Sequence, residues 1–189
     1  MTAPQTSSRL ARFEQLFGEH QRAVLAYALR RAPSTPDAED AAAETFTVAW
    51  RRLEDTPSDE PLPWLYAVCR RVLANQRRGR SRRERLAAAL GRLDDVPTPL
   101  RAGEDLDGPA FRALGTLSPA DQELLRLVAW EELGNDEIAQ VLGISPNAVA
   151  IRLHRARGRF AAVLKDSEPS RTSVEVRGTQ RAAWNGEAQ

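Results

Sequence analysis

Residues 134–160 read GNDEIAQVLGISPNAVAIRLHRARGRF, and this stretch predicts two short helices around a tight turn. A helix-turn-helix needs a small residue where the helices touch, a glycine where the backbone bends and apolar residues that lock the pair. Ala139 is the small residue, and Gly143 follows four positions later in the turn. The apolar residues that would lock the pair are Ile138, Leu142, Ile144, Val149 and Leu153.

The second of these helices has a basic outer face. Val149, Leu153, Ala156 and Phe160 recur at helical spacing and should face inward. The residues that would then point into a DNA major groove are Asn147, Ala148, Ile151, Arg152 and Arg155. Arginine suits phosphates and guanine edges, asparagine suits base edges, and isoleucine suits a thymine methyl. A helical hairpin with solvated arginines is the alternative, but the caps, the Ala–Gly spacing and the basic face together favour a DNA reader.

The composition suits two small domains better than one large core. The chain has 189 residues, of which 42% are hydrophobic and 28% charged. The net charge is only +1, but charges of one sign are grouped along the sequence. Acidic residues dominate 34–60, whereas 70–85 carry eight arginines and a single acidic residue, Glu84. Such alternation is expected when different faces of a protein meet different partners.

Several classes of protein are disfavoured. No run of eighteen apolar residues and no apolar signal core are present, so we expect a cytoplasmic protein without membrane insertion. The chain has a single cysteine, Cys69, so it cannot form an internal disulfide. We expect Cys69 to be a small buried apolar residue of the core. There is no phosphate loop, no His–carboxylate metal cluster and no Ser–His or Cys–His pair, so we expect no enzyme activity, no cofactor and no metal.

Helical periodicity organises the first half of the chain. Residues 9–31 predict one amphipathic helix, or a pair broken at Gly18. A second helix should start near Ser34 and end near Leu53, with Ala42, Phe46, Ala49 and Trp50 inward. The prolines of 54–63 predict a loop, and a third helix should open at Pro63.

The second half is expected to be helical as well. Ser118 and Asp121 form a predicted capping box, Gly134 should close that helix, and Asn135 should cap the next one. The last helix should run from Ser145 to about Leu164. Because no segment alternates between apolar and polar residues, the predicted fold is all-α, with two small helical domains joined by a flexible linker and a helix-turn-helix in the second. The predicted parts are a domain at 8–90, an acidic linker at 91–108, a domain at 109–165 and a disordered tail at 166–189.

The order of these segments resembles one protein family. DAEDAAAETFTVAWRR, PWLYAVCRRVLANQRR and LSPADQELLRLVAWEELGNDEIAQVLGISPNAVAIRLHRAR together resemble the extracytoplasmic-function (ECF) sigma factors of bacterial RNA polymerase, over roughly residues 10–165. The resemblance implies a promoter-specificity subunit whose partners are core RNA polymerase and promoter DNA. The family often has an anti-sigma factor as a further partner. The acidic linker would lie along the RNA channel of the polymerase.

In the N-terminal domain, the resemblance implies that the second helix docks on the clamp of the largest polymerase subunit. The implied contacts on this helix are Asp40, Glu44, Thr47 and Arg51. The pattern departs from the family at Ala43, where glutamine is common, and a merely solvated charged face is the alternative.

The loop and the third helix would melt and read the minus-ten promoter element. The implied DNA contacts there are Trp64, Arg70, Arg71, Asn75, Arg77 and Arg78. Trp64 could equally belong to the core, and Asn75 replaces a frequent aspartate, which leaves the base preference open.

The helix-turn-helix would read the minus-thirty-five element with its outer face. Ala148 and Ala150 stand where many relatives carry threonine or lysine, which suggests more reliance on DNA shape. The alternative function is a stand-alone helix-turn-helix regulator with an N-terminal dimerisation domain, which would bind a duplex without polymerase.

Overall fold

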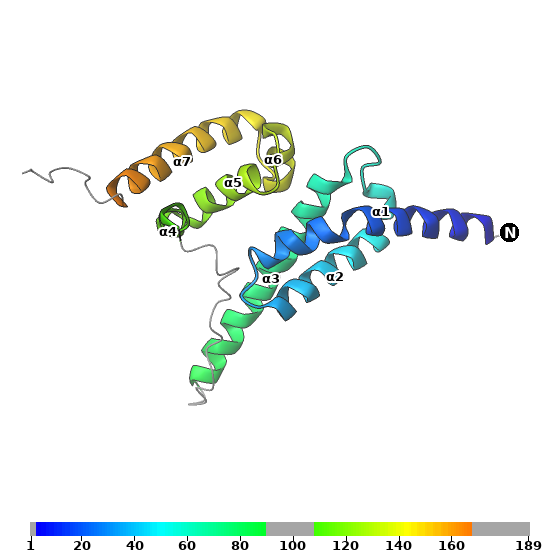
Figure 1. Ribbon diagram of the computed structural model, residues 1–189. Coiled ribbons are helices and arrows are strands. Elements are labelled where there is room, and N and C mark those ends of the chain that lie inside the picture. The colour runs from blue at the N-terminus through cyan, green and yellow to red at the C-terminus, as the bar shows by residue number, and fades with distance from the viewer. Residues whose placement is uncertain (1–2, 90–107, 168–189) are drawn as a thin grey trace, which may run out of the picture.

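The computed structural model describes residues 3–89 and 108–167, and within these ranges it leaves out the side chains of residues 3–6, 87 and 167. All regular structure in these ranges is helical, which confirms the predicted all-α fold of two small helical domains (Figure 1). The expected linker at 91–108 falls almost entirely outside the described residues. The expected tail at 166–189 does so beyond Ser167.

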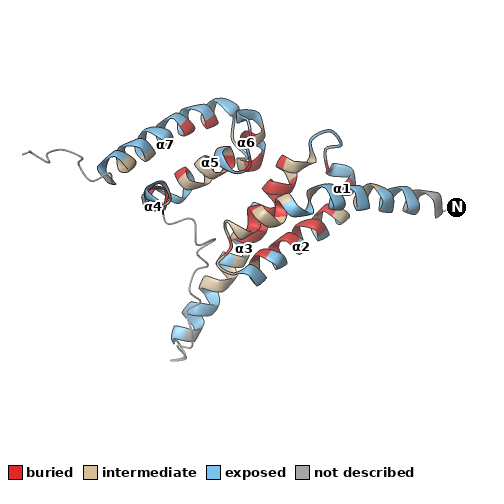
Figure 2. Ribbon diagram, in the orientation of Figure 1, coloured by how far each residue is buried: buried red, intermediate tan, exposed pale blue. Residues whose placement is uncertain are grey.

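The N-terminal domain consists of three helices and one short turn of 3₁₀ helix. These elements are α1 (Ala3–Leu29), α2 (Thr35–Arg51), the 3₁₀ turn (Leu53–Asp55) and α3 (Pro61–Ala89). Each of the three helices packs on the other two. Side chains at helical spacing close the core between them, including Val24, Phe46, Leu65 and Val72. Figure 2 shows the buried residues on the facing sides of these helices, while the C-terminal end of α3 extends away from the other two.

The C-terminal domain consists of four helices. They are α4 (Pro109–Thr116), α5 (Pro119–Ala129), α6 (Asn135–Leu142) and α7 (Pro146–Ser167). The helix α7 packs on the other three and serves as the centre of the domain. Val149 and Ala156 on α7 are fully buried, and Leu153 and Phe160 are buried and half-buried, as the inward spacing predicts.

Most caps lie where the sequence predicts them, because the side chains that can satisfy free backbone N–H groups are local. Ser34 accepts a hydrogen bond from the Asp37 N–H at 3.2 Å and so begins α2. Ser118 does the same for the Asp121 N–H, also at 3.2 Å, with Pro119 as the first residue of α5. Ser145 accepts from the Ala148 N–H at 3.2 Å and begins α7.

Several predicted boundaries are wrong by a few residues. The helix α3 begins at Pro61 rather than Pro63, because proline is compatible with the first turn of a helix, and the 54–63 loop contains the 3₁₀ turn. The helix α5 ends at Ala129, so Gly134 does not close it. Gly134 caps α6 instead, since its N–H donates to the Glu137 carboxylate at 2.7 Å, and Asn135 is the first helical residue. The helix α1 continues through Gly18, which excludes the broken pair.

The two domains are packed together. The helix α6 lies against α3, and one continuous apolar cluster contains residues of both domains, such as Leu65, Tyr66, Leu127 and Ile138. In Figure 1, α5 and α6 of the second domain lie beside the α1 and α3 end of the first. The arrangement therefore buries surface that each domain alone would expose.

Candidate nucleic-acid and polymerase interfaces

The turn between α6 and α7 has the geometry of a helix-turn-helix. Gly143 adopts a left-handed backbone with φ of 68°, which glycine adopts without the strain of a Cβ atom. Its N–H donates to the Ala139 carbonyl at 2.8 Å, and the Ile144 N–H donates to the same carbonyl at 3.1 Å. Ala139, Ile138 and Val149 are buried where the two helices meet, so the sequence identified the turn correctly.

The outward face of α7 is accessible. Asn147, Ile151, Arg152 and Arg155 are all exposed, and Ile151 is among the most exposed large apolar side chains of the described residues, at 46%. Ala148 is half-buried beneath the Ser145 cap, so it contributes less surface than the helical spacing predicts. An exposed isoleucine beside exposed arginines suits the mixed apolar and charged floor of a major groove.

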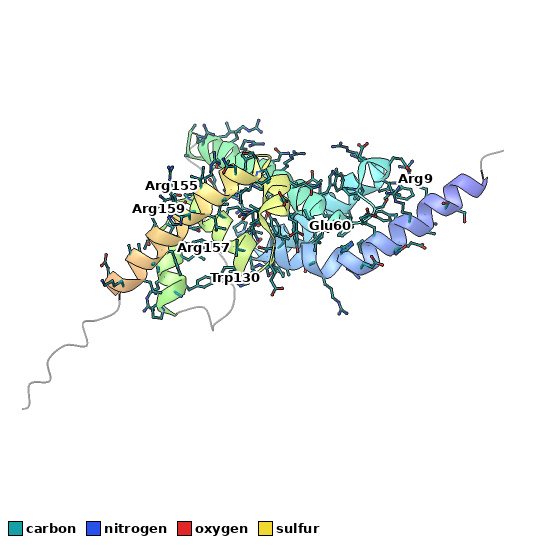
Figure 3. All side chains as sticks on the ribbon, turned by 90° about the horizontal axis from the view of Figure 1, so that it is seen from above. Arg9, Glu60, Trp130, Arg155, Arg157 and Arg159 are labelled. Carbon is teal, nitrogen blue, oxygen red and sulfur yellow. The ribbon has the colours of Figure 1, made fainter. Side chains whose placement is uncertain are left out.

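A third arginine of α7 is not free to bind DNA. Arg159 donates two hydrogen bonds to the Asp121 carboxylate, at 2.9 and 2.6 Å, and thereby ties α7 to the start of α5. Figure 3 shows Arg155, Arg157 and Arg159 along this helix. The ion pair separates Arg159, which holds the fold together, from Arg152 and Arg155, which face solvent.

The outward face of α2 is acidic at one end and basic at the other. Asp40, Glu44, Thr47 and Arg51 are exposed, whereas Phe46 and Ala49 between them are buried. Among the described residues, Asp40, Glu44 and Arg51 form no hydrogen bond or ion pair, and the Thr47 hydroxyl donates to the Ala43 carbonyl of its own helix at 3.0 Å. Side chains without an intramolecular partner are available to an external one.

The basic residues of α3 divide into exposed and engaged side chains. Arg70, Arg71, Arg77 and Arg78 are exposed, and so is Asn75, whose side-chain oxygen accepts a hydrogen bond from Arg78. Arg80 points back to the domain and donates to the Asp37 carboxylate at 2.7 Å. Hydrogen bonds from Ser34 and Arg80 lower the pKa of Asp37. The helix therefore presents exposed guanidinium groups at Arg70, Arg71, Arg77 and Arg78, while Arg80 serves the fold.

Trp64 combines the two roles that the sequence left open. Its ring is half-buried and packs on the hydrophobic core, and the Arg52 guanidinium lies over it at 6.0 Å from the centroid. The preceding loop borders a hollow of about 170 Å³ that is lined by residues of α1 and of the loop, including His20, Thr56 and Pro57. A half-buried aromatic ring at the edge of a core suits the stacking of a base.

Sequence reasoning missed one group of residues. Tyr27 of α1, together with Arg30 and Arg31 in the turn after α1, contacts Glu123 and Glu131 of the second domain. In the sequence, the arginines and glutamates look like ordinary surface charges, and no short motif relates positions about a hundred residues apart. Only the three-dimensional fold shows that these side chains lie next to the buried Glu131.

The described part of the chain contains no grouped metal ligands and no membrane-spanning helix. Within residues 3–89 and 108–167, no three His, Cys, Asp or Glu side chains are grouped to hold a metal ion. None of the helices described there has the length and apolar character needed to cross a bilayer.

Comparison with known proteins agrees with this architecture. Residues 16–83 match the family model Sigma-70 region 2, and residues 110–160 match Sigma-70, region 4. The RNA polymerase sigma factor NccH of Alcaligenes xylosoxydans xylosoxydans is 32% identical over 89% of this chain and 100% of its own length. The ECF RNA polymerase sigma factor SigL of Mycobacterium tuberculosis (strain ATCC 25618 / H37Rv) is 28% identical over 79% of this chain and 87% of its own. The solved structure of CnrH in complex with the cytosolic domain of CnrY is similar with a TM-score of 0.56, at 27% identity, and covers 82% of this chain and 88% of CnrH.

Proposed function

The chain belongs to the extracytoplasmic-function (ECF) sigma factors of RNA polymerase. From this membership we propose which of its exposed faces binds the polymerase and which bind promoter DNA. A sigma factor directs core polymerase to specific promoters and starts transcription there. It is an initiation factor and not an enzyme in its own right. Because it acts on the polymerase, its place of work is the cytoplasm.

The proposal assigns the outward face of α2 to the polymerase. Asp40, Glu44, Thr47 and Arg51 lie on one exposed face, and the two acids have no partner in the described part of the molecule. Free carboxylates attract a basic docking surface and orient the approach. The region 2 match covers this helix and supports the assignment.

The proposal assigns the loop before α3 and the exposed side of α3 to the minus-ten element. Trp64 provides a ring on which a base can stack, and Arg70, Arg71, Arg77 and Arg78 provide exposed positive charge for the strand. Asn75 lies among them with its amide exposed and suits a base edge. Melting a duplex requires both kinds of contact, because unstacked bases must be captured while the separated strand is held.

The proposal assigns the outward face of α7 to the minus-thirty-five element. Arg152 and Arg155 are exposed and have no partner among the residues that the structure describes, with Asn147, Ala148 and Ile151 on the same side. One observation supports the whole assignment: an exposed face with two carboxylates on α2 and an exposed face with two arginines on α7 occur in one chain that matches regions 2 and 4 in order.

Run-off transcription tests the proposal. Core polymerase is incubated with sheared DNA from the source genome, with and without the full chain, and the starts are mapped. Discrete starts that require the chain are expected. If the chain instead binds a duplex tightly without polymerase and supports no starts, it is a stand-alone regulator and the assignment of α2 fails.

We also propose that an anti-sigma factor regulates the chain. The support is the relationship to CnrH, whose solved structure contains the cytosolic domain of CnrY. Such a partner would cover the polymerase-binding and DNA-reading faces. A tagged full chain should retain a small partner protein when it is recovered from its own cells, and purified partner should suppress run-off transcription. Recovery of polymerase without any such partner would contradict this.

A further inference from the structure

The second domain has an apolar hollow that none of the proposed polymerase or DNA contacts uses. It has a volume of about 320 Å³ and lies between α4, α5 and α7. Arg157 of α7, which is exposed, is the only charged side chain among the described residues that line it. A lining of this kind suits an apolar group that has a negative charge close to it. The large apolar and aromatic side chains of the lining are Phe111, Leu114, Leu125, Val128, Trp130 and Phe160.

Two aromatic rings at this hollow are not fully covered by the described part of the chain. Trp130, which follows α5, is 39% exposed and is among the most exposed large apolar side chains of the described residues. The half-buried Phe111 meets it edge to face, at 6.0 Å between the ring centroids. Figure 3 shows Trp130 close to Arg157. Exposed aromatic rings beside a hollow are typical of a surface that binds another segment.

The size of the hollow limits what can fill it. Ligand pockets in proteins begin at about 300 Å³, so this hollow has room for one large side chain. Burying one aromatic side chain removes roughly 150–250 Å² from water. Each partner in a stable protein–protein interface buries about 800 Å², which is more than this hollow can supply. The geometry therefore favours a single aromatic side chain on a short segment over a second folded copy of the chain.

The sequence after α7 contains one such side chain. Trp184 is the only aromatic residue that follows Phe160, and Glu187 lies three positions after it. Arg157 forms no hydrogen bond or ion pair with another described residue, so its guanidinium is available to a carboxylate. An indole with a carboxylate close to it matches an apolar hollow with a guanidinium in its lining.

The position of the hollow suits a segment that is attached to the end of α7. Phe160 lines the hollow, and α7 ends at Ser167, about 10 Å further along the helix. A random chain of about seventeen residues, the separation of Ser167 from Trp184, spans about 20–25 Å on average, so the hollow lies within reach. A tether of this kind gives an effective concentration of about 1 mM. A contact with an untethered Kd of about 0.1 mM would then be about nine-tenths occupied.

We propose that Trp184 docks in the hollow between α4, α5 and α7 of its own chain, and that Glu187 pairs with Arg157. The docked segment covers Trp130 and Phe111 and holds this surface until a partner with a stronger apolar anchor displaces it. The docking does not depend on the proposed function, because both parts belong to the free chain.

Fluorine NMR of the full chain, labelled with 5-fluorotryptophan, tests the docking. The chain has four tryptophans, and substitution of each by phenylalanine assigns its signal. Trp184→Ala should shift the signal of Trp130 and should leave those of Trp50 and Trp64, in the first domain, unchanged. Because Trp184 belongs to none of the described helices, this variant should fold as the native chain does. Gln180→Ala, four residues earlier, is the control and should shift no tryptophan signal.

Charge reversal tests the pairing of Glu187 with Arg157. Arg157→Glu places two carboxylates together and should move the Trp184 signal toward its position in denaturant. The double variant Arg157→Glu, Glu187→Arg should restore the native position. Arg155→Glu makes the same charge change on the same helix, at an exposed residue that does not line the hollow, and should leave the Trp184 signal in place.

Three outcomes would overturn the proposal or part of it. If Trp184→Ala leaves the Trp130 signal unchanged, the segment does not dock, and the hollow is open to core polymerase or another protein. If the Trp130 shift grows with protein concentration and sedimentation shows a doubled mass, a second copy fills the hollow, which overturns docking within one chain. If Arg157→Glu leaves the Trp184 signal in place, the pairing with Glu187 is overturned.

Discussion

Arg159 on α7 forms two parallel hydrogen bonds to Asp121 at the start of α5, at 2.9 and 2.6 Å, and Asp121 also accepts a hydrogen bond from Ser118 at 2.8 Å. The Arg159 and Ser118 hydrogen bonds lower the pKa of the Asp121 carboxyl. One side chain thus joins the cap of α5 to the C-terminal half of α7. This contact fixes α7, the helix that carries the proposed DNA-reading face.

The contact between Asp121 and Arg159 should make the free energy of unfolding depend on pH. Its folded pKa lies below the unfolded value of about 3.9, so its contribution is complete above that pH and is lost as the pH falls through the folded pKa. Asp121→Asn should reduce the free energy of unfolding by about 1 kcal/mol at pH 7, since Arg159 is half exposed. Melting between pH 5 and pH 2 should show a smaller loss for this variant than for the native chain. Asp59→Asn, in the exposed loop, is the control and should behave as the native chain does.

Two glycines of the C-terminal domain should respond in opposite directions to alanine. Gly143→Ala should lower the free energy of unfolding by about 1–2 kcal/mol, because φ is 68° there although the space is open. Gly158→Ala should raise it by about 0.5–1 kcal/mol, since Gly158 is exposed within α7 and an added Cβ meets nothing within 4 Å. Denaturant melts of both variants check this. A stabilised Gly143→Ala would contradict the helix-turn-helix geometry.

The exposed arginines of α7 should carry promoter affinity. Arg152→Ala and Arg155→Ala should each weaken binding of the holoenzyme to its promoter by about 1–3 kcal/mol, roughly fivefold to 150-fold. Filter binding at fixed salt measures the change, because phosphate contacts are salt-dependent. Lys165→Ala lies at the far end of the same helix and should have a much smaller effect. Equal losses at all three positions would indicate general charge attraction rather than a reading face.

Charge reversal on α2 should separate polymerase binding from DNA binding. Glu44→Lys places a cation in the centre of the proposed docking face and should weaken binding to core polymerase several-fold or more, because like charges repel across the interface. Glu39→Lys makes the same change on an adjacent side of the same helix and serves as the matched control. Fluorescence anisotropy with labelled core enzyme measures both. The proposal fails if Glu39→Lys weakens binding more than Glu44→Lys.

Cys69 should be inert in the native protein. Burial raises the pKa of its thiol to about 11, and the side chain is fully buried. At pH 8 only about a thousandth of the thiol would be ionised, and the reagent would have no access to it. Ellman's reagent should therefore titrate no thiol in the native chain and one in denaturant. Rapid native labelling would show that the core around α3 opens readily.

Local order could be predicted from the sequence because its causes are local. Helical spacing identified the inward residues Val149 and Ala156, and cap chemistry identified Ser34 and Ser118, since each depends on neighbours within a few residues. The same spacing identified the exposed faces of α2 and α7. The boundary at Gly134 was wrong because α5 ends early in an irregular turn in which Glu132 has a φ of 55°.

What the sequence by itself determined is the set of helices, the helix-turn-helix and the exposed faces, together with the family resemblance that relatives confirm. Only the tertiary structure decided which charges serve the fold. Arg80, Arg159 and Arg31 read like their neighbours in a basic or mixed helix, yet they pair with Asp37, Asp121 and Glu123. The physical reason is that an ion pair depends on distance and burial in three dimensions. Neither is encoded in the spacing of residues separated by tens of positions along the chain.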